Sequence, residues 1–197
     1  AIKQLGTNGG GFFGPNSTHP FENPAFITNI VECVSILLIP MACVWMFGHI
    51  TGRIRHATIV FAVMSVLLVG AIGLAVHFES DPTAALAELP VQVTGNLEGK
   101  ELRFVAAASP VWGTLTTATS NGSVNSMHDS FNPLTGLIPL VGMWLNVAFG
   151  GVGVGLNNMF LYIIVGVFIC GMMVGRTPEF FNRKVETRVM KLALLAL

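Results

Sequence analysis

Residues 6–14 hold five glycines in nine positions, with Thr7 and Asn8 near their start. Glycine adopts positive φ angles that other residues avoid, and it lets a ligand approach the main chain closely. Two chemistries use such a run: backbone N–H groups that cradle phosphate, or backbone carbonyls that face a metal ion. A P-loop follows a strand and contains a lysine, whereas this run contains none and precedes a long apolar segment. The pattern favours the carbonyl loop.

A second loop of similar composition lies at residues 119–122. Its Ser120-Asn121-Gly122 can be laid over Thr7-Asn8-Gly9, because both have a hydroxyl, an amide and a glycine in that order. A potassium ion that sheds its water needs several neutral oxygens at once, and backbone carbonyls from converging loops can supply them. Two matched loops therefore predict an ion site between them.

The composition places these loops in a membrane protein. The 197 residues are 52% hydrophobic and only 10% charged, and the mean hydropathy is +0.69. Soluble domains carry roughly 25% charged residues. The three cysteines all lie in apolar segments, which argues against a disulfide framework or a metal site. Because the sequence lacks an initial methionine and stops within apolar sequence, we expect a fragment of a larger membrane protein.

Apolar segments of different lengths carry the loops. Residues 25–48 and 57–76 are each long enough to cross a bilayer as a helix. Residues 104–119 are too short and predict a re-entrant helix, after a mainly acidic segment at 79–103. Residues 130–175 are charge-free but broken by the glycines at 150–155. The sequence predicts an all-α integral membrane protein.

Basic residues cluster at 49–56 and 176–191, which the positive-inside rule places in the cytoplasm. The acidic segment then faces outside, and the re-entrant helix dips in from that side. The result is a repeat of helix, re-entrant pore helix, loop and helix, complete at 57–175 and half present at 1–48. Internal repeats in transporters place the ion site at their interface.

Several blocks resemble one family closely. They are Gly6-Thr7-Asn8-Gly9-Gly10-Gly11-Phe12-Phe13, His19-Pro20-Phe21-Glu22-Asn23-Pro24, Met127-His128-Asp129-Ser130-Phe131, Phe149-Gly150-Gly151-Val152-Gly153 and Gly175-Arg176-Thr177-Pro178-Glu179. They resemble the potassium-binding subunit (KdpA) of the Kdp-type potassium-transporting P-type ATPases along nearly the whole sequence. The resemblance implies a channel-like fold of the superfamily of K⁺ transporters, with four such repeats.

The resemblance assigns a role to each segment. Residues 1–48 become the second half of pore repeat 2. Residues 57–175 become repeat 3, with an outer segment at 79–103, a pore helix at 104–118, a filter at 119–122 and a broken helix at 130–175. Residues 176–197 become a cytoplasmic linker and the start of repeat 4. The implied filter carbonyls belong to Thr7, Asn8, Gly9, Thr119, Ser120, Asn121 and Gly122, with Gly10 and Gly11 in support, and the implied gate loop contains Gly150, Gly151, Gly153 and Gly155.

The resemblance also implies partners and a location. These are a P-type ATPase catalytic subunit, small accessory membrane subunits and the bilayer of a bacterial plasma (inner) membrane, with no nucleic acid. The bound species would be K⁺, with no organic cofactor, since ATP would be used by the catalytic subunit. We expect no ATP hydrolysis by this multi-pass chain itself, because it lacks a Walker-type loop. A passive potassium channel or an ion-coupled transporter of the same architecture is the alternative.

Some positions differ from the family pattern or suggest other chemistry. Asn121 stands where the family usually has cysteine, and Val154 where a small residue is usual. A carbonyl ligand is indifferent to its own side chain, so Asn121 is not expected to abolish ion binding. Glu32, inside an apolar segment, and His128 are the candidates for a membrane-embedded enzyme, but no nucleophile and base cluster with them.

Overall fold

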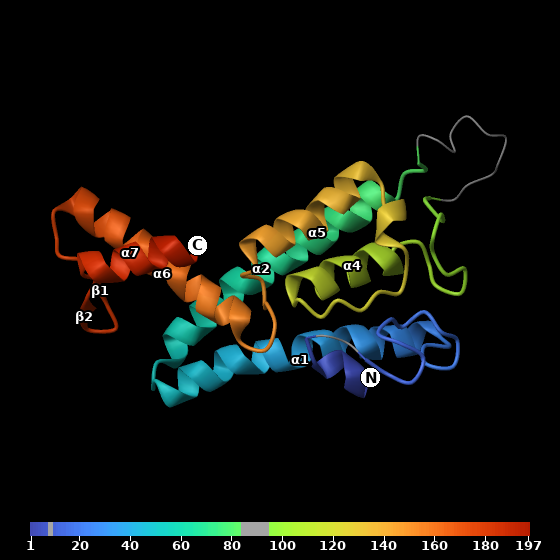
Figure 1. Ribbon diagram of the computed structural model, residues 1–197, viewed down its shortest axis with the longest axis horizontal. Helices are drawn as coiled ribbons and strands as arrows, with labels where there is room; N and C mark the ends of the chain where they lie inside the picture. The colour runs from blue at the N-terminus through green and yellow to red at the C-terminus, as the bar shows by residue number, and fades with distance from the viewer. Residues whose placement is uncertain (8–9, 84–94) are drawn as a thin grey trace. The chain divides into compact units, whose positions relative to one another are not determined.

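The computed structural model describes residues 1–7, 10–83 and 95–197, and Figure 1 traces their path. Helices dominate it, and the described strands form a single two-stranded sheet. The chain divides into two compact units, Ala1–Gly155 and Leu156–Leu197. The expected all-α membrane class is confirmed, because three described helices are long and apolar enough to cross a bilayer.

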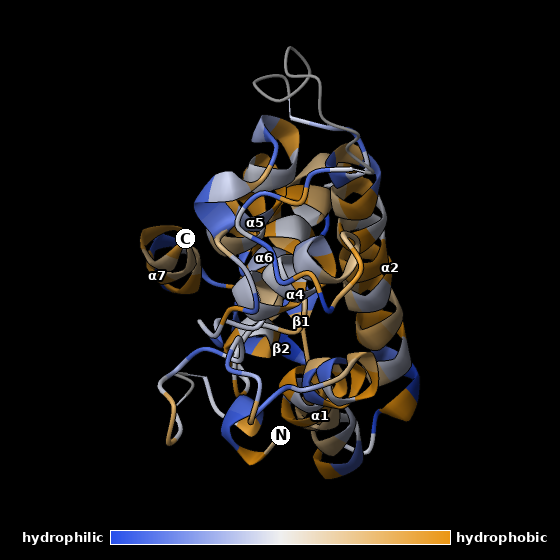
Figure 2. Ribbon diagram, turned by 90° about the vertical axis from the view of Figure 1, so that its right-hand side faces the viewer, coloured by the Kyte–Doolittle hydropathy of each residue, from blue (hydrophilic) through white to orange (hydrophobic). Residues whose placement is uncertain are grey.

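Two of these helices form an adjacent pair, α1 (Phe26–Ile50) and α2 (Ile54–Glu79). Only three residues join the two helices, so most of the basic stretch at 49–56 is helical. The boundaries of a helix follow its backbone hydrogen bonds, which can extend beyond the apolar residues of a span. The two helices meet closely at Gly48, where an added Cβ would lie 2.5 Å from the Ala57 Cβ. Figure 2 shows mostly apolar colour along both helices.

The short helix α4 (Ala108–Ala118) packs against α1, α2 and α5 (Pro133–Leu145), as Figure 1 shows. At 11 residues it is too short to span a bilayer. Nearly all of its residues are buried, and Trp112 is fully buried. A short helix with no outward face is held by its neighbours, so its C-terminal end has a defined position inside the unit.

A break separates α5 from α6 (Val154–Val174). The sequence predicted this break at residues 150–155, but α5 already ends at Leu145, because the capping residue Asn146 has a left-handed backbone with φ +43°. Asparagine tolerates this conformation better than most residues. The break therefore covers residues 146–153, and Gly155 already belongs to the first turn of α6.

The described part of the first unit also contains two 3₁₀ turns, η1 (Ile2–Leu5) and η2 (His128–Ser130). The C-terminal end of α2 is fixed by a buried carboxylate, Glu79, whose Oε1 accepts hydrogen bonds from Lys100 Nζ at 2.5 Å and Asn96 Nδ2 at 2.8 Å. Its Oε2 accepts from the backbone N–H of Asn132 at 3.0 Å. This cluster joins α2 to the segment before α4 and to the start of α5.

The second unit contains most of α6, a hairpin and α7 (Thr187–Ala196). The hairpin pairs β1 (Glu179–Phe180) with β2 (Arg183–Lys184), and sequence reasoning did not predict it. Its two turn residues, Phe181 and Asn182, have φ angles of +51° and +61°. Positive φ at both central positions is typical of the type I′ turn that joins two strands tightly.

Candidate ion-binding site

The loop at residues 119–122 directly follows α4. Its backbone alternates in conformation, because Ser120 and Gly122 have φ angles of +56° and +81° while Asn121 between them does not have a positive φ. The N–H of Asn121 still bonds back to Thr116 O at 2.9 Å. Within the described part of the chain, the carbonyl oxygens of Ser120, Asn121 and Gly122 accept no hydrogen bond. These are oxygens available to a cation.

The same loop is tied to the segment at the start of the chain. The side-chain amide of Asn121 donates to Gly6 O at 2.6 Å and to Gln4 O at 3.2 Å. Gly6 directly precedes Thr7, so the amide joins the two loops that the sequence predicted to converge. Asn121 is 1% exposed, which leaves these hydrogen bonds without competition from water.

A second set of polar side chains lies behind this contact. Ser123 Oγ lies 2.6 Å from Gln4 Oε1, and Gln4 Nε2 donates to Ser17 Oγ at 2.6 Å. The N–H of Ser17 donates to Val124 O at 3.0 Å. All three of these side chains are fully buried. The two loops are therefore joined by a network of hydrogen bonds rather than by one contact.

The loop at residues 7–11 is described only in part, because Asn8 and Gly9 lie outside the described residues. Gly10 has φ +141°, which favours glycine. At Gly11 an added Cβ would lie 2.9 Å from Lys3 Cδ and 3.0 Å from Glu22 Oε1. Lys3 Nζ donates to Glu22 Oε2 at 2.5 Å, so a small residue at position 11 lets this ion pair form.

The glycines at residues 150–155 form a compact turn beside the loop at 119–122. The N–H of Gly155 donates to Gly150 O at 2.6 Å, and that of Gly151 donates to Thr119 O at 2.8 Å. Phe149 has a left-handed backbone with φ +52°, which is uncommon for a large residue. Phe149 is 2% exposed and packs edge-on against Phe61 of α2. Packing of Phe149 thus holds the turn in place, and the N–H of Gly151 in this turn is hydrogen-bonded to the Thr119 carbonyl.

Electrostatics around the loop at 119–122 favour a cation. The C-terminus of α4 carries the negative end of the helix dipole and leads directly into Thr119. Glu22 is already paired with Lys3. Among the described residues, no group of three or more His, Cys, Asp or Glu side chains could hold a metal ion. Backbone carbonyls are therefore the main cation ligands that the described part of this region offers.

Glu32 is buried and His128 is half-buried, and the two lie in separate environments. His128 in η2 stacks against Phe131 with ring centroids 5.1 Å apart, and burial lowers the pKa of its imidazole below 6.5. Glu32 on α1 is 2% exposed.

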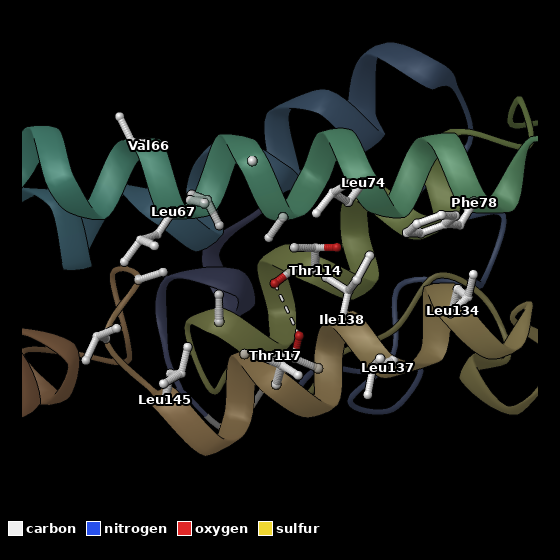
Figure 3. A pocket seen from close by; sticks show the side chains of 18 residues that line it. Val66, Leu67, Leu74, Phe78, Thr114, Thr117, Leu134, Leu137, Ile138 and Leu145 are labelled. Atoms are coloured by element: carbon white, nitrogen blue, oxygen red, sulfur yellow. Dashed lines mark hydrogen bonds between the residues drawn. The ribbon is translucent and has the colours of Figure 1, made fainter.

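An apolar cavity of about 490 Å³ lies behind α4, between α2 and α5. Figure 3 shows Leu74 and Phe78 on one side and Leu137 and Ile138 on the other, with the hydroxyls of Thr114 and Thr117 at the back. Thr117 Oγ1 donates to the carbonyls of Gly113 and Thr114 within its own helix. The cavity thus presents hydrocarbon rather than ion ligands and is separate from the loops.

Sequence reasoning missed the side-chain amides that link residues 23–29 to the segment after the loop at 119–122. Asn29 on α1 accepts from Asn23 Nδ2 at 3.1 Å and from Asn125 Nδ2 at 3.0 Å. All three side chains are buried. Arg103 also donates to Asn23 O at 3.1 Å and to the carbonyl of Thr18. Amide residues flanking apolar segments are the signal that could have suggested such a network, but their partners depend on the fold.

The sequence matches known proteins along its whole length. Residues 1–197 match the family described as "Potassium-transporting ATPase A subunit". The chain is 51% identical over 198 residues to a potassium-transporting ATPase potassium-binding subunit from Pseudomonas aeruginosa, covering 100% of this chain and 35% of that protein. A protein of the same name from Bacteroides thetaiotaomicron is 51% identical over 195 residues, covering 98% of this chain and 34% of that protein.

A more divergent relative gives the same result. A potassium-transporting ATPase potassium-binding subunit from Caldanaerobacter subterraneus is 46% identical over 199 residues, covering 100% of this chain and 36% of that protein. The chain spans about a third of the length of these relatives. The sequence blocks that suggested this resemblance include the first of the two loops that Asn121 joins in the structure. The chain belongs to the potassium-transporting ATPase A subunit family.

Proposed function

We propose that this chain supplies two of the carbonyl loops of a potassium-selective filter in a larger potassium-uptake protein. The observation that supports this most is the joining of the two loops by Asn121, next to three carbonyl oxygens that no described group occupies. Neutral carbonyls replace the hydration shell of a potassium ion, and the number and field of these dipoles govern selectivity. The negative end of α4 adds to that field.

In this proposal the ion contacts backbone oxygens of both loops. The ligand candidates are the carbonyls of Thr7, Asn8, Gly9, Thr119, Ser120, Asn121 and Gly122. Gly150, Gly151, Gly153 and Gly155 form a constriction next to the second loop. The bond from Gly151 N–H to Thr119 O supports this placement. The Thr119 carbonyl already accepts this bond, so in the second loop the carbonyls of Ser120, Asn121 and Gly122 are the ones that no described donor occupies.

The names of the relatives describe one subunit of a potassium-transporting ATPase, which supports a proposal of partner subunits. We propose that ATP is hydrolysed by a P-type partner subunit, with small accessory membrane subunits in the same complex, in a bacterial plasma membrane. Residues 1–48 would complete one pore repeat, residues 57–175 would form the next, and residues 176–197 would lead on to another. Two further repeats would be needed to close a four-fold filter around one ion.

Substitution of Gly122 by valine tests the filter in the full-length protein within its complex. The φ of +81° at Gly122 is strained for a β-branched residue, although an added Cβ meets nothing within 4 Å. We expect at least about a tenfold loss of potassium affinity or of selectivity over sodium. Gly73→Val on α2 is the matched control, since its added Cβ also meets nothing within 4 Å. Unchanged uptake kinetics and selectivity in Gly122→Val would refute the filter assignment.

A passive channel or an ion-coupled transporter with the same repeats is the second candidate. The fold alone does not separate them, because one architecture supports several transport modes. Co-purification with a P-type ATPase subunit, together with ATP hydrolysis stimulated by potassium, would support the ATP-driven system. Potassium flux from the isolated full-length protein without such a partner would support the passive alternative.

A further inference from the structure

The side chain of Asn121 forms hydrogen bonds through both its amide hydrogens and its oxygen. Its two amide hydrogens face Gly6 O at 2.6 Å and Gln4 O at 3.2 Å. Its Oδ1 accepts from the backbone N–H of Ser123 at 3.1 Å and lies 2.5 Å from Ser123 Oγ. A carboxamide offers two donors and one oxygen with two lone pairs. No other standard side chain of this size presents both functions in one plane.

The orientation of this amide is fixed by its backbone partners. The carbonyls of Gln4 and Gly6 only accept, so the NH₂ group must face them. The backbone N–H of Ser123 only donates, so Oδ1 must face it. A flipped amide would place two acceptors together and two donors together. The surroundings therefore require an asparagine in this orientation, and the side chain acts as a spacer of constant length.

The spacer connects the main chains of the two loops directly. Gly6 has an extended backbone, with φ −94° and ψ 170°, and directs its carbonyl at Asn121. The next residue, Thr7, begins the first loop, while Gly122 follows Asn121 in the second. Any change in the length or polarity of the Asn121 side chain thus changes the separation of the carbonyls on the two loops.

We infer that Asn121 is a positioning residue for ion selectivity, which acts through the Gly6 carbonyl rather than by binding the ion with its side chain. This inference rests on the proposed filter. Selectivity depends on how many carbonyls reach the ion and on their field. A spacer between loops controls that arrangement, whereas a residue that only supports the fold controls stability. The side chain at position 121 therefore matters, although a carbonyl ligand is itself indifferent to it.

Asn121→Asp is the most direct test, because aspartate keeps the shape but loses both amide hydrogens. Its oxygen would face two carbonyl oxygens in a buried site, which separates the loops. We expect selectivity for potassium over sodium, measured by ion-stimulated ATP hydrolysis and uptake of the full complex, to fall at least about tenfold. The maximal rate should change less than the half-saturating potassium concentration. Asn121→Ala, which adds no charge, should shift selectivity in the same direction.

Asn125→Asp is the matched control. Asn125 is a buried asparagine four residues later, and its side-chain amide donates to Asn29 on α1 rather than to either loop among the described residues. We expect this variant to lower thermal stability while selectivity stays within about twofold of the wild type. A fall in selectivity as large as that of Asn121→Asp would overturn the inference, because any buried asparagine would then have the same effect.

The outcomes separate this inference from the proposed filter. If Gly122→Val lowers selectivity but folded, assembled Asn121→Asp and Asn121→Ala complexes keep wild-type selectivity, the positioning role is overturned and the filter assignment stands. If selectivity is unchanged in all three variants, both are overturned. If Asn121→Asp fails to assemble, the selectivity of Asn121→Ala decides, and a wild-type value overturns the inference.

Discussion

A methyl group on Gly155 would collide with the turn at residues 150–155. Its Cβ would lie 2.1 Å from the backbone nitrogen of Gly150 and 2.8 Å from the Gly150 Cα. Real Cβ atoms essentially never approach other atoms within 3.0 Å, so Gly150 must move by about 1 Å. The neighbouring Gly151 donates to Thr119 O at 2.8 Å, and we expect Gly155→Ala to weaken that contact.

The energetic cost follows from two effects. Overpacking against a rigid backbone costs about 1–3 kcal/mol. Loss of the 2.6 Å hydrogen bond from Gly155 N–H to Gly150 O adds about 1 kcal/mol. A total of about 2–4 kcal/mol lowers the population of the native turn by about 30- to 700-fold relative to displaced conformations.

The assay is potassium-stimulated ATP hydrolysis and rubidium uptake by the full-length complex in proteoliposomes. We expect the half-saturating potassium concentration to change at least about tenfold in Gly155→Ala. Gly136→Ala is the control, because position 136 lies within α5 and an added Cβ there meets nothing within 4 Å. Wild-type uptake and half-saturation in Gly155→Ala would refute the view that this turn must pack against Thr119.

Three further predictions concern polar groups that are buried or half-buried. Lys100→Met leaves the carboxylate of Glu79 without its cation and should lower the free energy of unfolding by about 3 kcal/mol. The melting temperature should fall, and the second substitution Glu79→Gln should partly restore it. An unchanged melting temperature in Lys100→Met would contradict this. Because burial lowers the pKa of His128, the unfolded chain takes up its proton more readily, so stability should be complete above pH 6.5 and should decline as the pH falls below it. A His128→Asn variant should show a shallower decline in melting temperature, and an identical decline would count against the assignment. Asn29→Ala removes the acceptor of two buried amide groups and should cost about 2–4 kcal/mol; a melting temperature equal to that of the wild type would exclude this role.

The spans could be predicted from hydropathy alone, because about 20 apolar residues are needed to cross a bilayer. Their ends could not, since α2 begins at Ile54 and continues to Glu79, through charged residues that remain helical beyond the apolar core. The hairpin was missed because its turn residues, Phe181 and Asn182, are not the Asn-Gly pair that usually marks a type I′ turn.

Glycine spacing predicted the loops of the candidate site, because positive φ angles and close backbone approach both favour glycine. What spacing does not reveal is which side chain joins the loops. The bond from Asn121 to Gly6 spans 115 residues, and nothing local to either position specifies it. The same holds for Gly151 and Thr119, whose contact depends on where α5 ends and therefore on the left-handed residue Asn146.

The hydrogen bond between Gly151 N–H and Thr119 O has a thermodynamic consequence. If potassium competes with Gly151 for that oxygen, ion binding and turn displacement are reciprocally linked, and each changes the equilibrium of the other by the same factor. A partner that pulls the turn away would alter the affinity for potassium, and a bound ion would in turn make that pull easier. In the proposed complex, this one backbone contact would therefore couple the affinity for potassium to ATP hydrolysis by the partner subunit.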